Sequence, residues 1–117
     1  MEFNYQIETK DQVIIVSLEG ELIEKFQVKN MLDELAIRIK ETNKIILNLQ
    51  HLKYINSVGL NVMINILTKF RSAGGEVIVC SLSKKVRDLF LITKLNSVFN
   101  VLETLTEAKE YFNPSKE

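Results

Sequence analysis

The sequence lacks the features that mark most metal, redox, nucleic-acid and membrane proteins. Its single cysteine, Cys80, and single histidine, His51, provide neither an internal disulfide nor a zinc site of clustered His and Cys. Acidic and basic residues balance at 15 each, without the basic excess or stripe of nucleic-acid-binding proteins. No apolar run approaches the ~18 residues of a membrane-spanning helix, and residues 1–4 do not resemble a signal peptide. We therefore expect a soluble cytoplasmic protein that needs no metal or other cofactor, binds no nucleic acid and does not insert into a membrane.

The motifs of common enzyme classes are also missing. There is no glycine-rich phosphate loop, no carboxylate cluster and no Ser/His/Asp set that a fold could gather. Ser57 lies near His51 in the sequence, but a nucleophile elbow has glycine two residues to each side of the serine, and position 55 is isoleucine. We predict that the chain is not an enzyme and has no catalytic residue.

Length and apolar content favour one domain with a real core. A chain of 117 residues can bury roughly two-thirds of its unfolded surface, and 46% of these residues are hydrophobic. Only four glycines and one proline are present, which argues against low complexity. Cys80 is expected to be a small buried hydrophobe at the end of a strand.

Alternation and β-branched runs predict four strands. Residues 3–8 alternate apolar with polar side chains, as an edge strand does, and residues 10–12 can turn the chain into a second strand over residues 13–18. This second strand is apolar on both faces, and we expect the two to form an antiparallel hairpin. Further strands are predicted over residues 44–49 and 76–80, with a brief extended piece over residues 98–102.

Apolar stripes at helical spacing predict about four helices between and after these strands. They cover residues 28–40, residues 60–70 with a glycine stop at positions 74 and 75, residues 83–92 after an N-cap at Ser83, and a last helix opened by Thr104 or Thr106 that ends at Phe112. A helix between two strands favours right-handed crossovers to parallel strands. The sequence thus predicts one α/β domain over residues 1–112, with a mixed four-stranded sheet, and a C-terminal tail over residues 113–117.

The stretch most suggestive of function is Tyr54-Ile55-Asn56-Ser57-Val58-Gly59-Leu60. It lies where a strand gives way to a helix, and residues 50–55 are expected to form a loop that delivers Ser57 to the helix start. The first N–H groups of a helix have no partner inside it, so this position favours negative charge. Serine and asparagine are also preferred N-caps, and from spacing alone the capping role is the favoured interpretation of Ser57.

Motifs along nearly the whole chain resemble those of STAS domains, and among them the stand-alone anti-sigma-factor antagonists of bacteria. The motifs are Gly20-Glu21-Leu22 after an early strand, Asn48-Leu49 before the serine loop, Asn56-Ser57-Val58-Gly59-Leu60 at the helix start, Ala73-Gly74-Gly75 before the last strand, and Val86 with Leu89-Phe90 after it. In that family the serine of an Asp-Ser-x-Gly-Leu motif is phosphorylated by a partner kinase, and Ser57 matches it.

The resemblance implies a STAS-like fold and regulated protein binding. The chain would capture an anti-sigma factor of the serine-kinase type and so free a sigma factor, with the partner's ATP as phosphoryl source and a serine phosphatase as a further partner. A phosphoryl group on Ser57 would find candidate donors in the N–H groups of Val58, Gly59 and Leu60. The expected state is a monomer or weak dimer. The predicted partner-binding residues are Ile23, Asn56, Ser57, Val58, Gly59, Asn61 and Val62.

Three of these positions carry particular expectations. Val58 and Val62 are expected to form a partly exposed apolar strip, while Ile66 is expected to be buried. Gly59 is expected to keep side-chain bulk away from a phosphate and a partner, or to serve a tight junction by its backbone freedom.

Two positions depart from the family pattern, in which Asp usually precedes the serine and often follows Gly-Glu-Leu. Here these positions are Asn56 and Ile23, so both carboxylates near Ser57 are missing. The alternative function is therefore a non-switching STAS docking or regulatory subunit of a transporter or stress-sensing complex.

Overall fold

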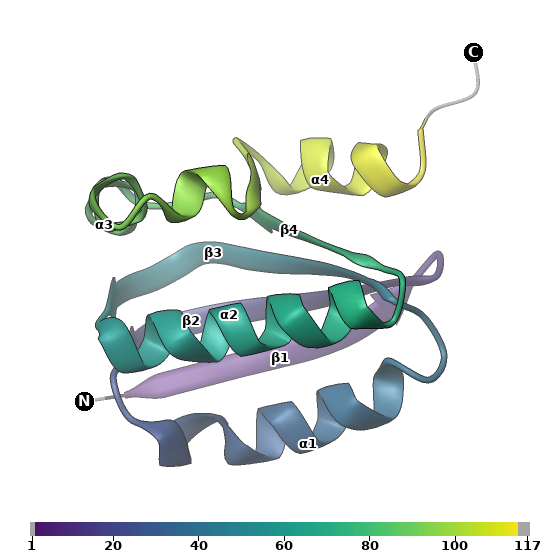
Figure 1. Ribbon diagram of the computed structural model, residues 1–117, viewed down its shortest axis with the longest axis horizontal. Helices are drawn as coiled ribbons and strands as arrows, with labels where there is room; N and C mark the ends of the chain where they lie inside the picture. The colour runs from purple at the N-terminus through teal and green to yellow at the C-terminus, as the bar shows by residue number, and fades with distance from the viewer. Residues whose placement is uncertain (1, 115–117) are drawn as a thin grey trace.

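A mixed five-stranded sheet in the order β1-β2-β3-β4-β5 is the centre of the fold in the computed structural model, which describes residues 2–114 (Figure 1). The strands are β1 (Phe3–Lys10), β2 (Val13–Leu22), β3 (Lys44–Ile55), β4 (Glu76–Cys80) and β5 (Asn100–Leu102). The helices are α1 (Lys29–Arg38), α2 (Ser57–Ser72), α3 (Lys84–Ile92) and α4 (Leu105–Phe112), with 3-10 helices η1 (Lys25–Val28) and η2 (Leu95–Ser97).

The predicted hairpin and parallel crossovers are confirmed. β1 pairs antiparallel with β2 from Phe3↔Gly20 to Lys10↔Val13, while β2, β3, β4 and β5 pair in parallel. Asp11 and Gln12 turn the hairpin with φ values of 53° and 65°, and such positive values match the right-handed twist of the flanking strands.

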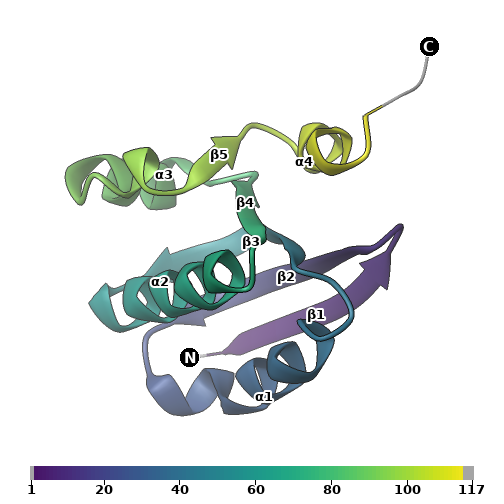
Figure 2. The same cartoon turned by 45° about the vertical axis from the view of Figure 1, so that its right-hand side comes forward.

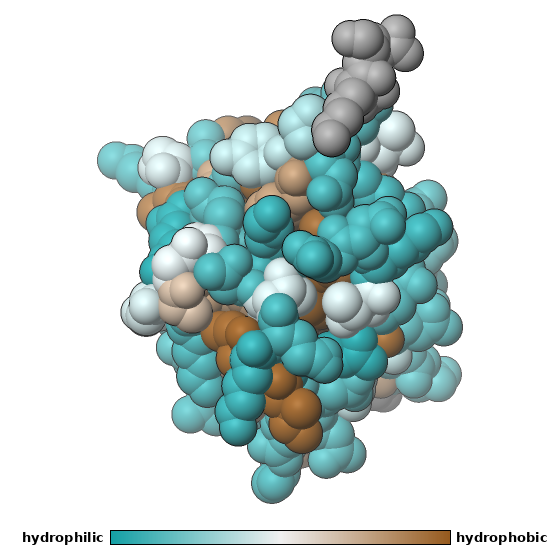
Figure 3. Space-filling model, turned by 90° about the vertical axis from the view of Figure 1, so that its right-hand side faces the viewer, coloured by the Kyte–Doolittle hydropathy of each residue, from teal (hydrophilic) through white to brown (hydrophobic). Residues whose placement is uncertain are grey.

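Two apolar clusters lie on opposite faces of the sheet. The larger one combines inward-facing residues of β2, β3 and β4 with buried residues of α1, α2 and α3. The smaller one places Ala108 of α4 against Val13, Ile46 and Cys80. Figures 1 and 2 show α1 and α4 on opposite sides of the sheet. The end of the molecule with the β1–β2 turn is mainly hydrophilic, with a hydrophobic strip in its lower half (Figure 3).

The structure corrects three boundaries. The sheet has five strands where four were predicted, because the extended piece after α3 includes β5, which pairs with β4. Residues 50–55 are not a loop, since β3 continues to Ile55 beside the end of β2, with Glu21↔Tyr54 and Leu22↔Ile55 as partners. Register shifts between Ser17 and Glu19 and between Gly20 and Glu21 let this pairing continue past the apolar run. The first helix is also shorter than predicted, because η1 precedes α1.

Of the predicted tail over residues 113–117, only Asn113 and Pro114 fall within the described residues; residues 115–117 lie outside them. Among the helices of residues 2–114, none has the length and apolarity to cross a membrane.

Candidate functional site

Asn56 fixes the first turn of α2 to the end of β2. It is the N-cap of α2, with extended backbone angles, and its Oδ1 accepts a hydrogen bond from the Gly59 N–H at 3.1 Å. Its Nδ2 donates to the Ile23 carbonyl at 3.1 Å, and its own N–H donates to the Leu22 carbonyl at 3.4 Å. The helix start is thus held in place by one side chain that both donates and accepts.

Ser57 is the first residue of α2, and its side chain is exposed. Because Asn56 serves as the N-cap, the capping interpretation of Ser57 is wrong, and the Ser57 hydroxyl makes no hydrogen bond to any other group in residues 2–114. The Gly59 N–H donates to Asn56 Oδ1, and the Leu60 N–H donates to the Asn56 carbonyl at 2.9 Å. Neither group is therefore free to donate to a phosphate, as had been predicted for both. The N–H groups of Ser57 and Val58 have no partner inside the helix.

Gly59 is buried where α2 meets the ends of β2 and β3. A Cβ at this position would collide with Cγ1 of Ile55 and lie 2.7 Å from the Leu22 carbonyl oxygen. The expectation that a side chain here would crowd a phosphate or a partner is therefore corrected: the crowding is internal. No positive φ is required of this glycine.

The predicted apolar strip is only half present at the surface. Val62 is 3% exposed and belongs to the core together with Ile66, because η1 lies against α2 at this point. Val58 is half-buried, and Asn61 is exposed. The expected burial of Ile66 is confirmed, and Val62 presents little surface to a partner.

A hollow of about 530 Å³ lies on the η1 side of Ser57, between η1 and α2. Ile23, Phe26, Val58, Asn61 and the edge of Val62 line it, and Phe26 is 75% exposed. Five predicted partner-binding positions thus lie together near the start of α2 and the end of β2: Ile23, Ser57, Val58, Asn61 and Val62. The other two, Asn56 and Gly59, form the junction between these elements.

A second hollow, of about 390 Å³, lies on the other side of Ser57, between the end of β3 and α3. Ser57 and Tyr54 line it together with Leu89 and Ile92 of α3, and Ile92 is 79% exposed. The Lys85 ammonium lies 5.6 Å from the centre of the Tyr54 ring, a cation–π contact across the same hollow.

The α3 side of this surface was not found from the sequence. Its available signal was Ile92, an apolar residue at the very end of the predicted helix, where it has no core to face. Phe26 was the corresponding signal on the η1 side, because it is a lone aromatic residue between Lys25 and Gln27. We call the two hollows and Ser57 between them the Ser57 surface.

The other reactive side chains lie away from this surface. His51 is exposed and lines neither hollow, as expected of a loop or strand histidine without a nucleophile nearby. Cys80 is buried at the end of β4, and this burial raises the pKa of its thiol, although a hydrogen bond with Ser81 acts in the opposite direction. In the part of the chain that the structure describes, no group of His, Cys, Asp and Glu side chains is placed to hold a metal ion.

Comparison with known proteins places these features in a family. The sequence profile of the STAS domain matches residues 4–108. BtrV of Bordetella bronchiseptica, provisionally named an anti-sigma factor antagonist, is 30% identical over 103 residues, which are 87% of this chain and 88% of BtrV. The anti-sigma F factor antagonist of Paenibacillus polymyxa is 32% identical over 112 residues, covering 89% of this chain and 95% of that protein.

A solved structure agrees with these matches. The crystal structure of a Thermotoga maritima protein, also provisionally named an anti-sigma factor antagonist, superposes with a TM-score of 0.80 at 27% identity, over 93% of this chain and 94% of the other. The relatives are named as regulators rather than as enzymes, in agreement with the prediction that the chain is not an enzyme.

Proposed function

Because the chain belongs to the STAS domain family, we propose that it is an anti-sigma-factor antagonist, a cytoplasmic protein that binds an anti-sigma factor of the serine-kinase type and so releases a sigma factor. The partner's kinase activity would phosphorylate Ser57 and end the binding, and a serine phosphatase would restore it.

The observation that carries this proposal is the unengaged hydroxyl of Ser57. A serine that only capped α2 would direct its oxygen to the N–H groups of the first turn, but Asn56 does this instead. The Ser57 side chain is left at the surface between two mostly apolar hollows. Exposed apolar surface of this kind, with polar side chains beside it, is typical of protein-binding surfaces.

Phosphorylation of Ser57 would change this surface without disturbing the fold. A phosphoryl group adds ~1.5 to 2 negative charges, which the positive end of the α2 dipole and the free N–H groups of Ser57 and Val58 would tolerate. A partner packed on the Ser57 surface would have to desolvate that charge and make room for the added bulk. Binding would therefore be lost while the domain stays folded.

Asn56 keeps the N-cap bond that an aspartate would make at this position and adds one that an aspartate could not make. Aspartate at this position could accept from the Gly59 N–H but could not donate to the Ile23 carbonyl, as the Asn56 amide does. The amide also removes one negative charge beside the acceptor hydroxyl, which would reduce repulsion of an incoming phosphoryl group.

Mass spectrometry after incubation with the cognate kinase and ATP tests the switch. One phosphoryl group on Ser57 is expected, and none on the variant Ser57→Ala. Ser72, exposed at the other end of α2, serves as the internal control and should stay unmodified. An unmodified Ser57 would contradict the phosphoswitch.

A second candidate is a docking subunit that never switches. It is favoured by Asn56 and Ile23, which leave the surroundings of Ser57 without the carboxylates typical of switching relatives. If this candidate is right, the chain will co-purify with a transport ATPase or a stress-sensing complex instead of a soluble ATP-binding kinase, and Ser57 will remain unphosphorylated in the purified assembly.

A further inference from the structure

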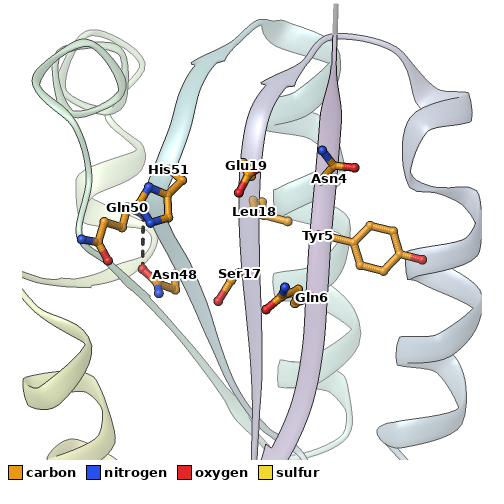
Figure 4. A pocket seen from close by; sticks show the side chains of 9 residues that line it. All are labelled: Asn4, Tyr5, Gln6, Ser17, Leu18, Glu19, Asn48, Gln50 and His51. Carbon is orange, nitrogen blue, oxygen red and sulfur yellow. Dashed lines mark hydrogen bonds between the residues drawn. The ribbon is translucent and has the colours of Figure 1, made fainter.

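A polar hollow of about 610 Å³ lies on the sheet face that α4 leaves uncovered (Figure 4). Side chains of β1, β2 and β3 form its floor in two cross-strand rows. One row is Gln6, Ser17 and Asn48, and the next is Asn4, Glu19 and His51, as the strand register pairs them. Neighbouring strands lie about 4.8 Å apart and residues two apart on a strand about 6.6 Å, so the six polar side chains face an area of about 10 by 7 Å, which is large enough for one sugar ring.

The buried Asn48 side chain distinguishes this floor from an ordinary solvent-exposed sheet face. It is 8% exposed and is the one polar side chain among the buried residues of the described chain. Its Oδ1 accepts from the Gln50 N–H at 3.2 Å, where the strand bulges, but its Nδ2 donates to no group within residues 2–114. This nitrogen is not sealed in the interior, since every fully enclosed side-chain N or O atom of the described residues has a partner, and Asn48 lines the hollow. The two hydrogens of this amide therefore face the hollow, where water or the oxygen of a ligand can accept them.

The charges around the hollow restrict what can supply that acceptor. Glu19 lines the hollow and has no ion-pair partner among the described residues. No lysine or arginine lines this hollow. Lys53 lines an adjoining hollow, which also includes Glu2 and Glu19, so carboxylates outnumber the one ammonium group there. An anionic ligand in this hollow would meet the Glu19 carboxylate with no cation among the lining residues, and an apolar ligand would leave the floor's hydrogen-bonding groups unpaired.

We propose that this hollow binds a small polyhydroxylated amine, of the amino-sugar class. Its hydroxyl oxygens accept from Asn48 Nδ2 and from the amides of Asn4 and Gln6, its hydroxyl hydrogens donate to Ser17 and His51, and its ammonium group pairs with Glu19. The site lies on the opposite face of the sheet from the core that α2 packs against, so it is separate from the Ser57 surface and does not depend on the proposed function.

Titration of the full chain by two-dimensional NMR tests the proposal with three probes that differ in charge. D-glucosamine is a cation, D-glucose is neutral and glucose 6-phosphate is an anion. We expect saturable shifts that centre on Ser17, Asn48 and His51, with glucosamine bound about 2- to 5-fold more tightly than glucose and glucose 6-phosphate bound least.

Two matched variants localise the charge preference. Glu19→Gln should reduce glucosamine affinity to that of glucose. Glu8 lies on β1, on the same face as Gln6 but outside the hollow, so Glu8→Gln should leave the preference for glucosamine unchanged. The proposal is overturned if no probe gives saturable shifts on this floor, if glucosamine and glucose bind the native chain equally, if the phosphate binds as tightly as the amine, or if Glu19→Gln keeps the preference.

Discussion

At the scale of single residues, the hydrogen bonds of Asn56 leave the Ser57 hydroxyl free to react. The Asn56 amide accepts from the first turn of α2 and donates to the carbonyl that follows β2, so Ser57 is not needed as the helix cap. From spacing alone the sequence favoured the capping role for Ser57, but the carbonyl that holds Asn56 in that role belongs to Ile23, 33 positions away. Such a partner cannot be read from local spacing.

Asn56→Asp should destabilise the chain by about 1 kcal/mol, because the Ile23 carbonyl loses its donor while the bond to the Gly59 N–H is kept. Asn56→Ala, which removes both bonds, should cost about 2 kcal/mol. Denaturant unfolding measures both. Equal stability of the native chain and Asn56→Asp would show that the donated bond contributes nothing.

Gly59→Ala should destabilise the chain by about 2 kcal/mol in spite of alanine's better helix propensity, because its Cβ enters the space of the Ile55 side chain and the Leu22 carbonyl. Asn61→Ala, exposed in the same helix, is the control and should change stability by less than about 0.5 kcal/mol. The free energy of unfolding of the two variants is the measurement. A Gly59→Ala chain as stable as Asn61→Ala would contradict the close packing of Gly59 against Ile55 and Leu22.

At the scale of elements, β3 and α4 show where sequence patterns end. The apolar run over residues 45–49 predicted the buried half of β3, whereas the half that reaches Ser57 depends on bulged pairing with β2, which periodicity does not reveal. β5 has only three half-buried residues and is a strand because β4 lies beside it. For α4, the open choice between Thr104 and Thr106 is settled by a capping box: the Thr104 hydroxyl accepts from the Glu107 N–H at 3.1 Å, and Glu107 accepts from the Thr104 N–H.

Thr104→Ala should loosen α4 by about 1 kcal/mol, because it removes the hydroxyl that accepts from the Glu107 N–H and leaves only the bond from the backbone N–H of residue 104 to Glu107. α4 packs over the cluster that contains Cys80, whose thiol pKa is raised by burial. A thiol reagent should therefore modify Cys80 slowly in the native chain and faster in Thr104→Ala, while Thr106→Ala should match the native rate. Equal rates for the two variants would show that the capping box does not hold α4 down.

At the scale of the whole molecule, the fold class and element order followed from the sequence because hydrophobic periodicity reflects which face of each element is buried. The composition of the surface did not follow. Val62 has the spacing of a flank residue but is covered by η1, while Phe26 and Ile92, spaced far apart in the sequence, are exposed on either side of Ser57. We propose that the domain covers residues 1–112; the family profile matches to residue 108.

Phe26→Ser and Ile92→Ser should each weaken binding of the anti-sigma factor about 10-fold or more, because exposed apolar side chains in hollows are the usual anchors of an interface. Stability should hardly change, since neither side chain is buried in the free chain. Ile37→Ser, on the outer face of α1 and 65% exposed, is the control and should bind normally. Affinities are measured by calorimetry. Equal affinities for all three variants would show that the partner does not bind at the Ser57 surface.

The most direct measurement is the dissociation constant of the anti-sigma factor for the native chain, Ser57→Glu and Ser72→Glu. The two substitutions add the same charge to exposed positions at opposite ends of α2, about 22 Å apart along the helix. We predict that Ser57→Glu weakens binding at least 10-fold, because the partner must desolvate the new carboxylate, while Ser72→Glu binds like the native chain. Undiminished binding of Ser57→Glu would contradict the claim that Ser57 lies at the centre of the docking surface.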